Sequence, residues 1–242
     1  RNRLALYSNG EPLVVSGAIT GAPGTAVQVG YDFAGVDPAV LSNVILAGPN
    51  TFDGGVTFAL GTLGIASNAV YSGSTITSSP LGKGALTIGS ATLLPSHEPT
   101  LMAVGQTRFV PNAVVATRDF AVATSSPAVL FVLENSVDLG AGPRRATIES
   151  GASLFLRGPL LGGAATSLVK SGAGTLTIDQ TGQFAGSIVA NQGVTRFSGN
   201  YGIAGNMHIG PGAQAVIDPG PTKVLATSNL SIDAANGGAL NV

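Results

Sequence analysis

The chain has 242 residues, of which 44% are hydrophobic, 10% are charged and 35 are glycine, and its formal net charge is -1. Soluble domains usually contain about 25% charged residues and about 7% glycine, so this surface is unusually uncharged and this backbone unusually rich in glycine. The 11 basic residues are spread thinly and form no basic stripe. This excludes a surface for a phosphate backbone and predicts no nucleic-acid partner.

The chain has no cysteine, which excludes disulfides, thiolate catalysis and cysteine metal ligands. Mean hydropathy is +0.39. The most notable apolar run, Ala128 to Leu133, is nevertheless far shorter than the roughly 20 residues that a membrane-spanning helix needs. We therefore expect no membrane span in this segment. Because the sequence starts and ends within its pattern, we also expect it to be an interior or processed part of a longer protein.

Short runs of strand-forming residues, bounded by Gly, Asn, Asp, Ser or Pro, follow one another along the chain. Within "TLTI", Leu176 and Ile178 share one face, and Thr175 and Thr177 share the other. Strands of about four to six residues at intervals of about 8–12 residues predict an all-β protein. Residues 107–140 are the richest in large apolar side chains and predict wider coils. In chain order, the strand-bearing segments are 13–24, 50–65, 81–90, 107–140, 146–158, 167–200, 207–220 and 229–242.

Internal repetition favours a solenoid among the all-β folds, because stacked coils need only neighbour contacts. Segment 13–24 resembles 154–165 at an offset of 141, and 81–90 resembles 171–180. We predict one solenoid segment over 1–242, with repeat units at about 13–96 and 154–242 and linking coils at 97–153. A further offset of 132 relates Phe52 to Phe184, Gly54 to Gly186, Val56 to Ile188, Gly61 to Gly193 and Ile65 to Phe197.

The segment "LVKSGAGTLTIDQTGQFAGSIVANQGVTRF" resembles the passenger-associated transport repeat, also called the autotransporter-associated β-strand repeat. Lys170, Gly172, Gly174 and Leu176 are in register with that pattern, and so is the upstream copy "NTFDGGVTFALGTLGI". The second copy departs from it, because Ser187 replaces a glycine. The resemblance implies a right-handed parallel β-helix in the secreted passenger of a bacterial surface protein. We expect about 10–12 coils in a rod of about 50–60 Å.

Catalysis on such a fold needs carboxylates that converge with each other, with a basic residue or with a metal. No acidic residue lies within two positions of another, although stacked coils could bring Glu149 near Asp179. We predict no catalytic residue, no cofactor and no metal site. The acidic residues are Glu11, Asp32, Asp37, Asp53, Glu98, Asp119, Glu134, Asp138, Glu149, Asp179, Asp218 and Asp233.

Other polar motifs are interpreted as structural. His97 with Glu98 lacks the second histidine of a zincin, and His208 is expected on an outward strand position. "GKGA" at 82–85 and "SGAGTL" at 171–176 lack the spacing of phosphate-binding loops and predict turns. Arg144 and Arg145 are expected in a solvated turn, with contact to an anionic glycan as the alternative. Asn229 fits a glycosylation sequon, which matters only in a eukaryotic secretory route.

Four phenylalanines are expected in the core rather than on a sugar-binding platform: Phe131, Phe155, Phe184 and Phe197. The sequence predicts a non-catalytic structural or adhesive β-solenoid, and the resemblance to the transport repeat implies that it lies at an extracellular bacterial surface. Its expected partners are neighbouring coils of the same chain or identical subunits stacked end to end, together with surface glycans or a host surface. The alternatives are a β-helix polysaccharide lyase or glycoside hydrolase, and an adhesin that binds glycans or a host.

Overall fold

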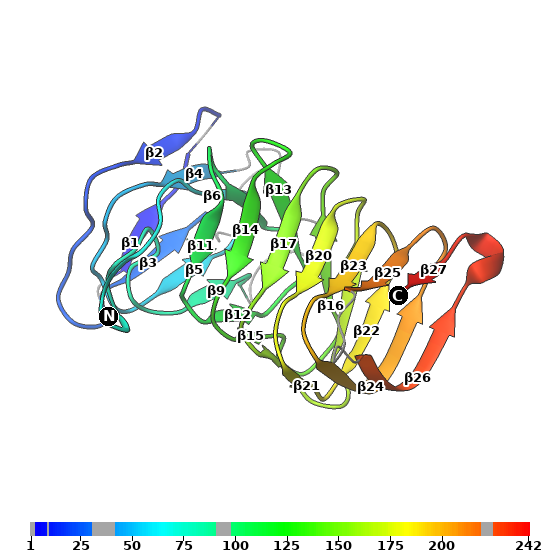
Figure 1. The fold of residues 1–242 in the computed structure, drawn as a ribbon. Coiled ribbons are helices and arrows are strands. Elements are labelled where there is room, and N and C mark those ends of the chain that lie inside the picture. The colour runs from blue at the N-terminus through cyan, green and yellow to red at the C-terminus, as the bar shows by residue number, and fades with distance from the viewer. Residues whose placement is uncertain (1–2, 9, 31–41, 91–97, 219–224) are drawn as a thin grey trace.

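The chain forms an elongated parallel β-solenoid of about nine turns, with its two ends at opposite ends of the body (Figure 1). This computed structural model describes residues 3–8, 10–30, 42–90, 98–218 and 225–242. Every strand ladder between these residues is parallel, except that of a hairpin formed by β7 (Val70–Ser72) and β8 (Thr75–Ser78). The prediction of an all-β protein with a parallel β-helix is confirmed.

Three sheets run along the solenoid axis. The first sheet contains β1 (Arg3–Leu6), β3 (Ala26–Val29), β5 (Val56–Phe58), β9 (Leu86–Ile88), β12 (Val114–Ala116), β15 (Val137–Asp138) and β18 (Leu160–Leu161). The third sheet contains β11 (Arg108–Val110), β14 (Leu130–Leu133), β17 (Ser153–Leu156), β20 (Thr175–Ile178), β23 (Val194–Phe197), β25 (Gln214–Ile217) and β27 (Ala239–Asn241).

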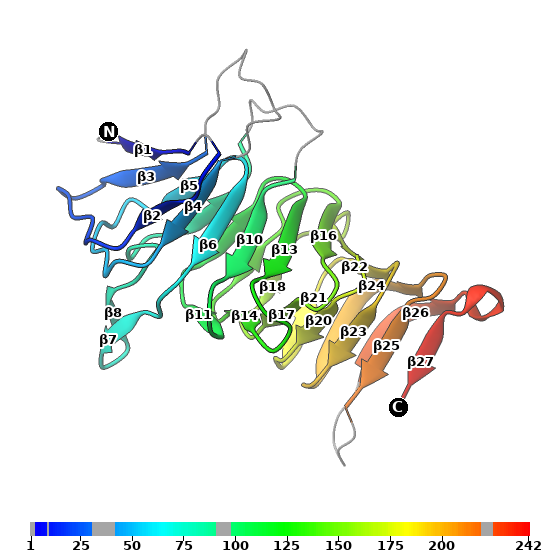
Figure 2. The same cartoon turned by 90° about the horizontal axis from the view of Figure 1, so that it is seen from above.

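The second sheet is the longest and spans almost the whole body (Figure 2). A short 3-10 helix, Ala234–Asn236, precedes β27. The strands of the second sheet are β2 (Leu13–Val15), β4 (Asn43–Leu46), β6 (Thr62–Ile65), β10 (Thr100–Ala103), β13 (Phe120–Thr124), β16 (Arg144–Ile148), β19 (Ser167–Ser171), β22 (Ser187–Ala190), β24 (Tyr201–Ile209) and β26 (Leu225–Ile232), with β21 (Gly182–Phe184) paired to β24.

The number of turns is smaller than the expected 10–12, because several turns are longer than expected. In the second sheet, the step from Thr62 to its partner Thr100 is twice as long as the step from Ile188 to its partner Met207. The long step contains the β7–β8 hairpin. At one strand spacing of about 4.8 Å per turn, nine turns give an axial length of about 40–45 Å.

Segment 107–140, which is rich in large apolar side chains, belongs to comparatively long turns. Phe109 pairs with Val132, a step of 23 residues, and Phe120 pairs with Ala146, a step of 26 residues. The step from Ser167 to its partner Ser187 is 20 residues.

Side chains alternate between the interior and the outside along each strand, as the pleat of a strand requires. Leu176 and Ile178 of β20 are fully buried, as predicted, and they continue inward stacks with Leu154 and Leu156 of β17. The interior is mainly aliphatic, with Phe131, Phe184 and Phe197 buried among these stacks as predicted. Phe155 is the exception, because it points outward from β17 and is half-buried.

The third sheet begins, within the described residues, only at β11, and the β7–β8 hairpin emerges just before it (Figure 2). An unpaired strand edge presents free backbone donors and acceptors that invite pairing with another chain. Here the backbone N–H of Phe109 in β11 donates to the Asn68 side-chain oxygen at 3.1 Å. The segment that leads into the hairpin therefore caps this edge.

The internal repeat at an offset of 132 places its members in equivalent positions but on different sheets. Phe52 and Phe184 are both buried, and each precedes a buried strand residue that points inward, Val56 in the first copy and Ile188 in the second. The first copy continues through β5 in the first sheet and β6 in the second, whereas the second copy continues through β22 in the second sheet and β23 in the third. The repeat thus specifies two strands and the corner between them. The second copy lies one sheet further around the solenoid axis than the first copy.

Glycines allow the corners of one turn to pack against the backbone of the previous turn. A Cβ atom on Gly54 would lie 2.5 Å from the carbonyl oxygen of Thr25, and one on Gly186 would lie 2.2 Å from that of Thr166. The "GKGA" and "SGAGTL" corners behave in the same way, because a Cβ on Gly82 or Gly172 would strike a carbonyl oxygen of the preceding turn. These segments are turns, as predicted.

We predict that Gly186→Ala destabilises the solenoid by about 2 kcal/mol or more, because the new methyl group would overlap a backbone oxygen that cannot move away without breaking the ladder. Gly163→Ala is the matched control, since a Cβ there meets no atom within 4 Å. Denaturant unfolding followed by circular dichroism measures both variants. Equal stability of the two variants would show that the corner contact is unimportant.

Candidate functional site

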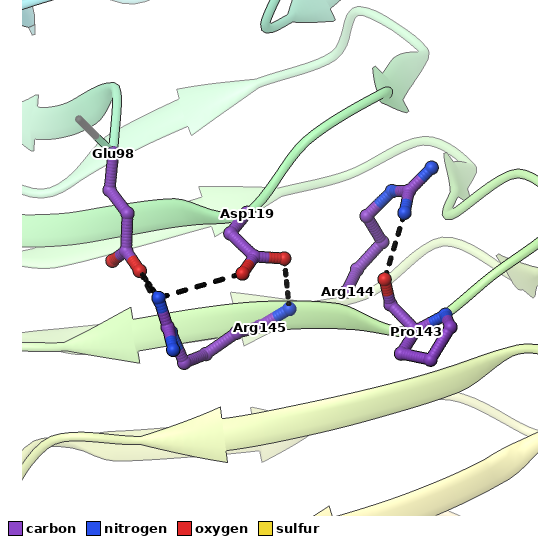
Figure 3. Close-up of polar contacts among 5 residues, drawn as sticks. All are labelled: Glu98, Asp119, Pro143, Arg144 and Arg145. Carbon is purple, nitrogen blue, oxygen red and sulfur yellow. Dashed lines mark hydrogen bonds and ion pairs between the residues drawn. The ribbon is translucent and has the colours of Figure 1, made fainter. Parts of the chain in front are cut away.

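An acidic pair from adjacent turns is bridged by Arg145 at the start of the second-sheet strands (Figure 3). The register of β13 with β16 places Asp119 beside Arg145, and Glu98 lies one turn earlier. The Arg145 guanidinium contacts Glu98 and lies 3.5 Å from Asp119, whose other oxygen accepts the Arg145 backbone N–H at 2.9 Å. The hydrogen bond with Glu98 and the two negative charges raise the pKa of Arg145 above its ordinary value.

Arg144 and Arg145 do not lie in a turn, because both belong to β16. Arg144 points away from the acidic pair (Figure 3) and donates from Nε to the Ala116 carbonyl at 3.0 Å. One arginine therefore forms ion pairs with two carboxylates, and the other binds the backbone of the preceding turn. Exposed pairs of this kind contribute about 0–1 kcal/mol each to stability.

A second charged group, which we call the Arg157 ladder, consists of Glu134, Arg157, Asp179, Ser198 and Asp218. Each of these residues directly follows a strand of the third sheet, and each backbone N–H donates to the turn before it. The Arg157 guanidinium lies 3.9 Å from Glu134 and 3.6 Å from Asp179. Further along, Asp218 accepts from Arg196 and, at 2.9 Å, from the Ser198 hydroxyl.

The Arg157 ladder borders an apolar row on the outward face of the third sheet. The row is Phe109, Val132 and Phe155, which pair in register across β11, β14 and β17. Arg157 lies over the Phe109 ring, with its Cζ atom 5.6 Å from the ring centroid. Val132 points outward yet is only 1% exposed, so this row is a second, external apolar layer. That layer explains why the prediction of a core position for Phe155 is wrong.

The hairpin reaches the Arg157 ladder. The Tyr71 hydroxyl donates to Glu134 at 3.2 Å, and burial, followed by the charge of Glu134, raises the pKa of Tyr71. Tyr71 is itself 46% exposed. The outward face of the third sheet thus combines three aromatic rings with two carboxylates and an arginine.

A cleft of about 450 Å³ opens where the third-sheet strands end, beside the Arg157 ladder. Its lining comes from three consecutive turns: Arg157, Pro159, Asp179, Gln180, Thr181 and Gly199. The Gln180 side-chain nitrogen is buried and has no hydrogen-bond partner, and the same holds for the Tyr201 hydroxyl. Unpartnered buried polar atoms are rare in native structures and call for an explanation.

The two unpartnered groups lie near each other. Burial raises the pKa of Tyr201, and the neighbouring Gln180 side chain partly offsets that rise. Their geometry nevertheless does not complete a hydrogen bond between them. Gln180 lines the cleft, whereas its buried amide nitrogen lies beside the Tyr201 hydroxyl.

The convergence of Glu149 with Asp179 does not occur. Glu149 follows β16, at the corner that leads into the third sheet, and Asp179 follows β20, at the far end of that sheet. The ion-pair partner of Asp179 is Arg157. Within the described residues, no group of three His, Cys, Asp or Glu side chains could hold a metal ion.

The histidine and the sequon asparagine that the structure describes both lie on strands near the C-terminal end of the second sheet. His97 lies outside the described residues. His208 points outward from β24, as predicted, with Nδ1 2.8 Å from the Ser231 hydroxyl. Asn229 lies on β26 and donates to the Asn206 side-chain oxygen at 3.0 Å. Each of these described side chains bridges two neighbouring turns.

Lys170 is an unexpected buried charge. It occupies an inward position of β19 and is fully buried, paired with Ala146 on one side and Ala190 on the other. The small alanines leave room for the long side chain. Its amino group donates to the Gly172 carbonyl and, at 2.8 Å, to that of Gln192. Burial lowers the pKa of Lys170 to about 8.

The sequence contained a signal for the Arg157 ladder that local motifs did not reveal. Glu134, Arg157 and Asp179 are each one turn apart, because the strands that precede them pair in register. An alignment of the sequence at intervals of one turn would have placed these three charged residues beside one another. The arrangement can bind hydrogen-bonding groups, because its carboxylates accept and its guanidinium and amide donate.

Comparison with known proteins finds no matching family model, no matching curated protein and no matching solved structure. No helix in the described part of the chain has the length and apolar character needed to cross a membrane.

We predict that the free energy of unfolding rises by about 1–2 kcal/mol between pH 7 and 9.5, through Lys170. The folded-state pKa of about 8 lies below the ordinary lysine value of 10.5, so the unfolded chain binds more protons in this window and raising the pH favours the folded state. Lys170→Met should abolish the rise, whereas the exposed Lys83→Met should keep it. Denaturant titrations across this pH range test the prediction, and an unchanged slope in Lys170→Met would contradict it.

Proposed function

We propose that this chain is a non-catalytic β-solenoid of a bacterial cell surface, acting as a stalk or fibre segment that holds other parts of an assembly away from the cell. The observation that carries the proposal is the uninterrupted stacking of about nine turns on an aliphatic interior. Each turn contacts mainly its neighbours, so the same pattern can extend a rod without changing its cross-section. The resemblance of residues 168–197 to the transport repeat supports the surface location.

The outward chemistry of the rod supports a structural role. Polar side chains on successive turns mostly bind one another, as Arg145 does with Glu98 and Asp119, and as His208 does with Ser231. Such contacts run parallel to the axis and tie each turn to the next. They contribute cohesion along the rod rather than a reactive centre.

The ends of the described solenoid support axial stacking. β1 and β26 lie at opposite ends, and each is the last strand of its sheet. Their side chains include exposed apolar residues, namely Leu4 on β1 and Leu230 and Ile232 on β26. Parallel strand edges and apolar side chains suit a further turn, supplied by more of the same chain or by an identical subunit.

An enzymatic role as a polysaccharide lyase or hydrolase is favoured by one observation only. Glu134 and Asp179 flank Arg157, which is a carboxylate and arginine combination of the kind such enzymes use. However, the guanidinium forms ion pairs with both carboxylates and fills the space between them. A glycosidase needs that space for the sugar or for a water molecule. We therefore propose that these groups do not carry out hydrolysis or elimination.

We predict that intact cells of the source organism release peptides of this chain when treated with an external protease. A surface rod is accessible before lysis, whereas an internal protein is not. Mass spectrometry of the released peptides makes the measurement, with a cytoplasmic enzyme as the control for lysis. Peptides that appear only after lysis would contradict the surface proposal.

We also predict that the purified chain releases no reducing ends and no unsaturated products from polygalacturonate, cellulose or chitin. A reducing-sugar assay and absorbance of unsaturated uronates detect the two reaction types. If product forms and Asp179→Asn stops its formation, the enzymatic alternative is correct.

A further inference from the structure

We propose that the cleft beside the Arg157 ladder binds a neutral oligosaccharide. This inference goes beyond the structural role and does not depend on it, because a rod can be built with or without a ligand site. It concerns the six cleft-lining residues named above, together with the half-buried Phe155 on the outward face of β17.

The size of the cleft suits a small ligand. Its volume of about 450 Å³ falls within the range of about 300–1,000 Å³ that is typical of ligand pockets. The lining comes from three consecutive turns, so the cleft extends about 10 Å along the axis. Gly199 has no side chain to fill it, and a Cβ there would lie 2.0 Å from the Gln180 carbonyl oxygen. Such a length suits more than one sugar ring.

The polar lining offers donors and acceptors side by side. Asp179 accepts, Gln180 both donates and accepts, and the Thr181 hydroxyl also does both. The Gln180 nitrogen is buried beside the Tyr201 hydroxyl and has no completed hydrogen bond. Rotation of the amide from Tyr201 toward the cleft would present this donor to a ligand oxygen. Sugar hydroxyls, which donate and accept at neighbouring carbons, match this alternation.

The charges of the site select a neutral ligand over a charged one. The Arg157 guanidinium already faces Glu134 and Asp179, so an added carboxylate or phosphate would meet two negative charges around a single positive one. Among the residues that line the cleft, a divalent cation would find one carboxylate ligand, Asp179, and this ligand lies beside the positive charge of Arg157. Both charged classes are therefore disfavoured by electrostatics.

The apolar row supplies the remaining element of sugar recognition. Phe155 points outward from β17, two residues before Arg157, which follows the strand and lines the cleft. Aromatic rings pack against the C–H faces of sugars, while polar groups bind the hydroxyls, so both kinds of surface are present on adjoining turns. The aromatic and polar groups are held by strands and their immediate continuations, which fixes their spacing.

Titration of the purified chain tests the inference, with cellohexaose, maltohexaose and chitohexaose as neutral probes and trigalacturonate as the anionic probe. Calorimetry and shifts of backbone amide resonances provide the readouts. We expect at least one neutral probe to bind at millimolar concentration or more tightly, with resonance shifts at Gln180 and Thr181. Trigalacturonate should bind at least tenfold more weakly than that probe.

Substitutions then assign the binding to the cleft. Gln180→Ala and Thr181→Val should each weaken binding about tenfold while leaving the circular dichroism spectrum and melting midpoint unchanged. Gln106→Ala is the matched control, because Gln106 is exposed in a turn at the opposite end of the third sheet. Absence of binding by all three neutral probes, preference for trigalacturonate, or equal weakening by Gln106→Ala would each overturn the proposal.

Discussion

The close approach of glycine corners such as Gly54 and Gly186 to the backbone of the turn before them is the contact on which the other features depend. A parallel solenoid needs its turns one strand spacing apart, about 4.8 Å. At Gly54 and Gly186, a single methyl group would already overlap the Thr25 or Thr166 carbonyl oxygen. Where the corners meet at this distance, the strands that follow them are brought into register. The inward stacks and the outward ladders of side chains are both consequences of that register.

The displacement of the internal repeat by one face shows what the repeat encodes. Phe52 and Phe184 occupy the same place relative to their glycine corners, yet the strands that follow belong to different sheets. A local segment can specify its own corner and the two strands beside it. It cannot specify how much chain the earlier turns have used, and the β7–β8 hairpin lengthens one turn only. The face on which a repeat falls is therefore set by the sum of the preceding turn lengths.

The same stacking accounts for the charged clusters. Carboxylates one turn apart, such as Glu98 and Asp119, would repel each other if no cation lay between or beside them. Arg145 and Arg157 each join two acidic residues from different turns, and Lys170 joins two corner carbonyls inside the core. A chain with only 10% charged residues thus uses many of them as links between turns. A cleft adjoins the Arg157 ladder.

The sequence by itself determined the fold class, the inward positions of Leu176 and Ile178, and the structural role of the glycine corners. These features depend on the alternation of side chains along a strand and on the conformation of local turns. Both are set by residues that are close together in the sequence. Only the tertiary structure decided which polar residues meet, because Arg157 and its partners lie one turn apart and one turn of the second sheet is twice as long as another. It also placed Phe155 outside, since the external apolar layer exists only once three turns and the hairpin have come together.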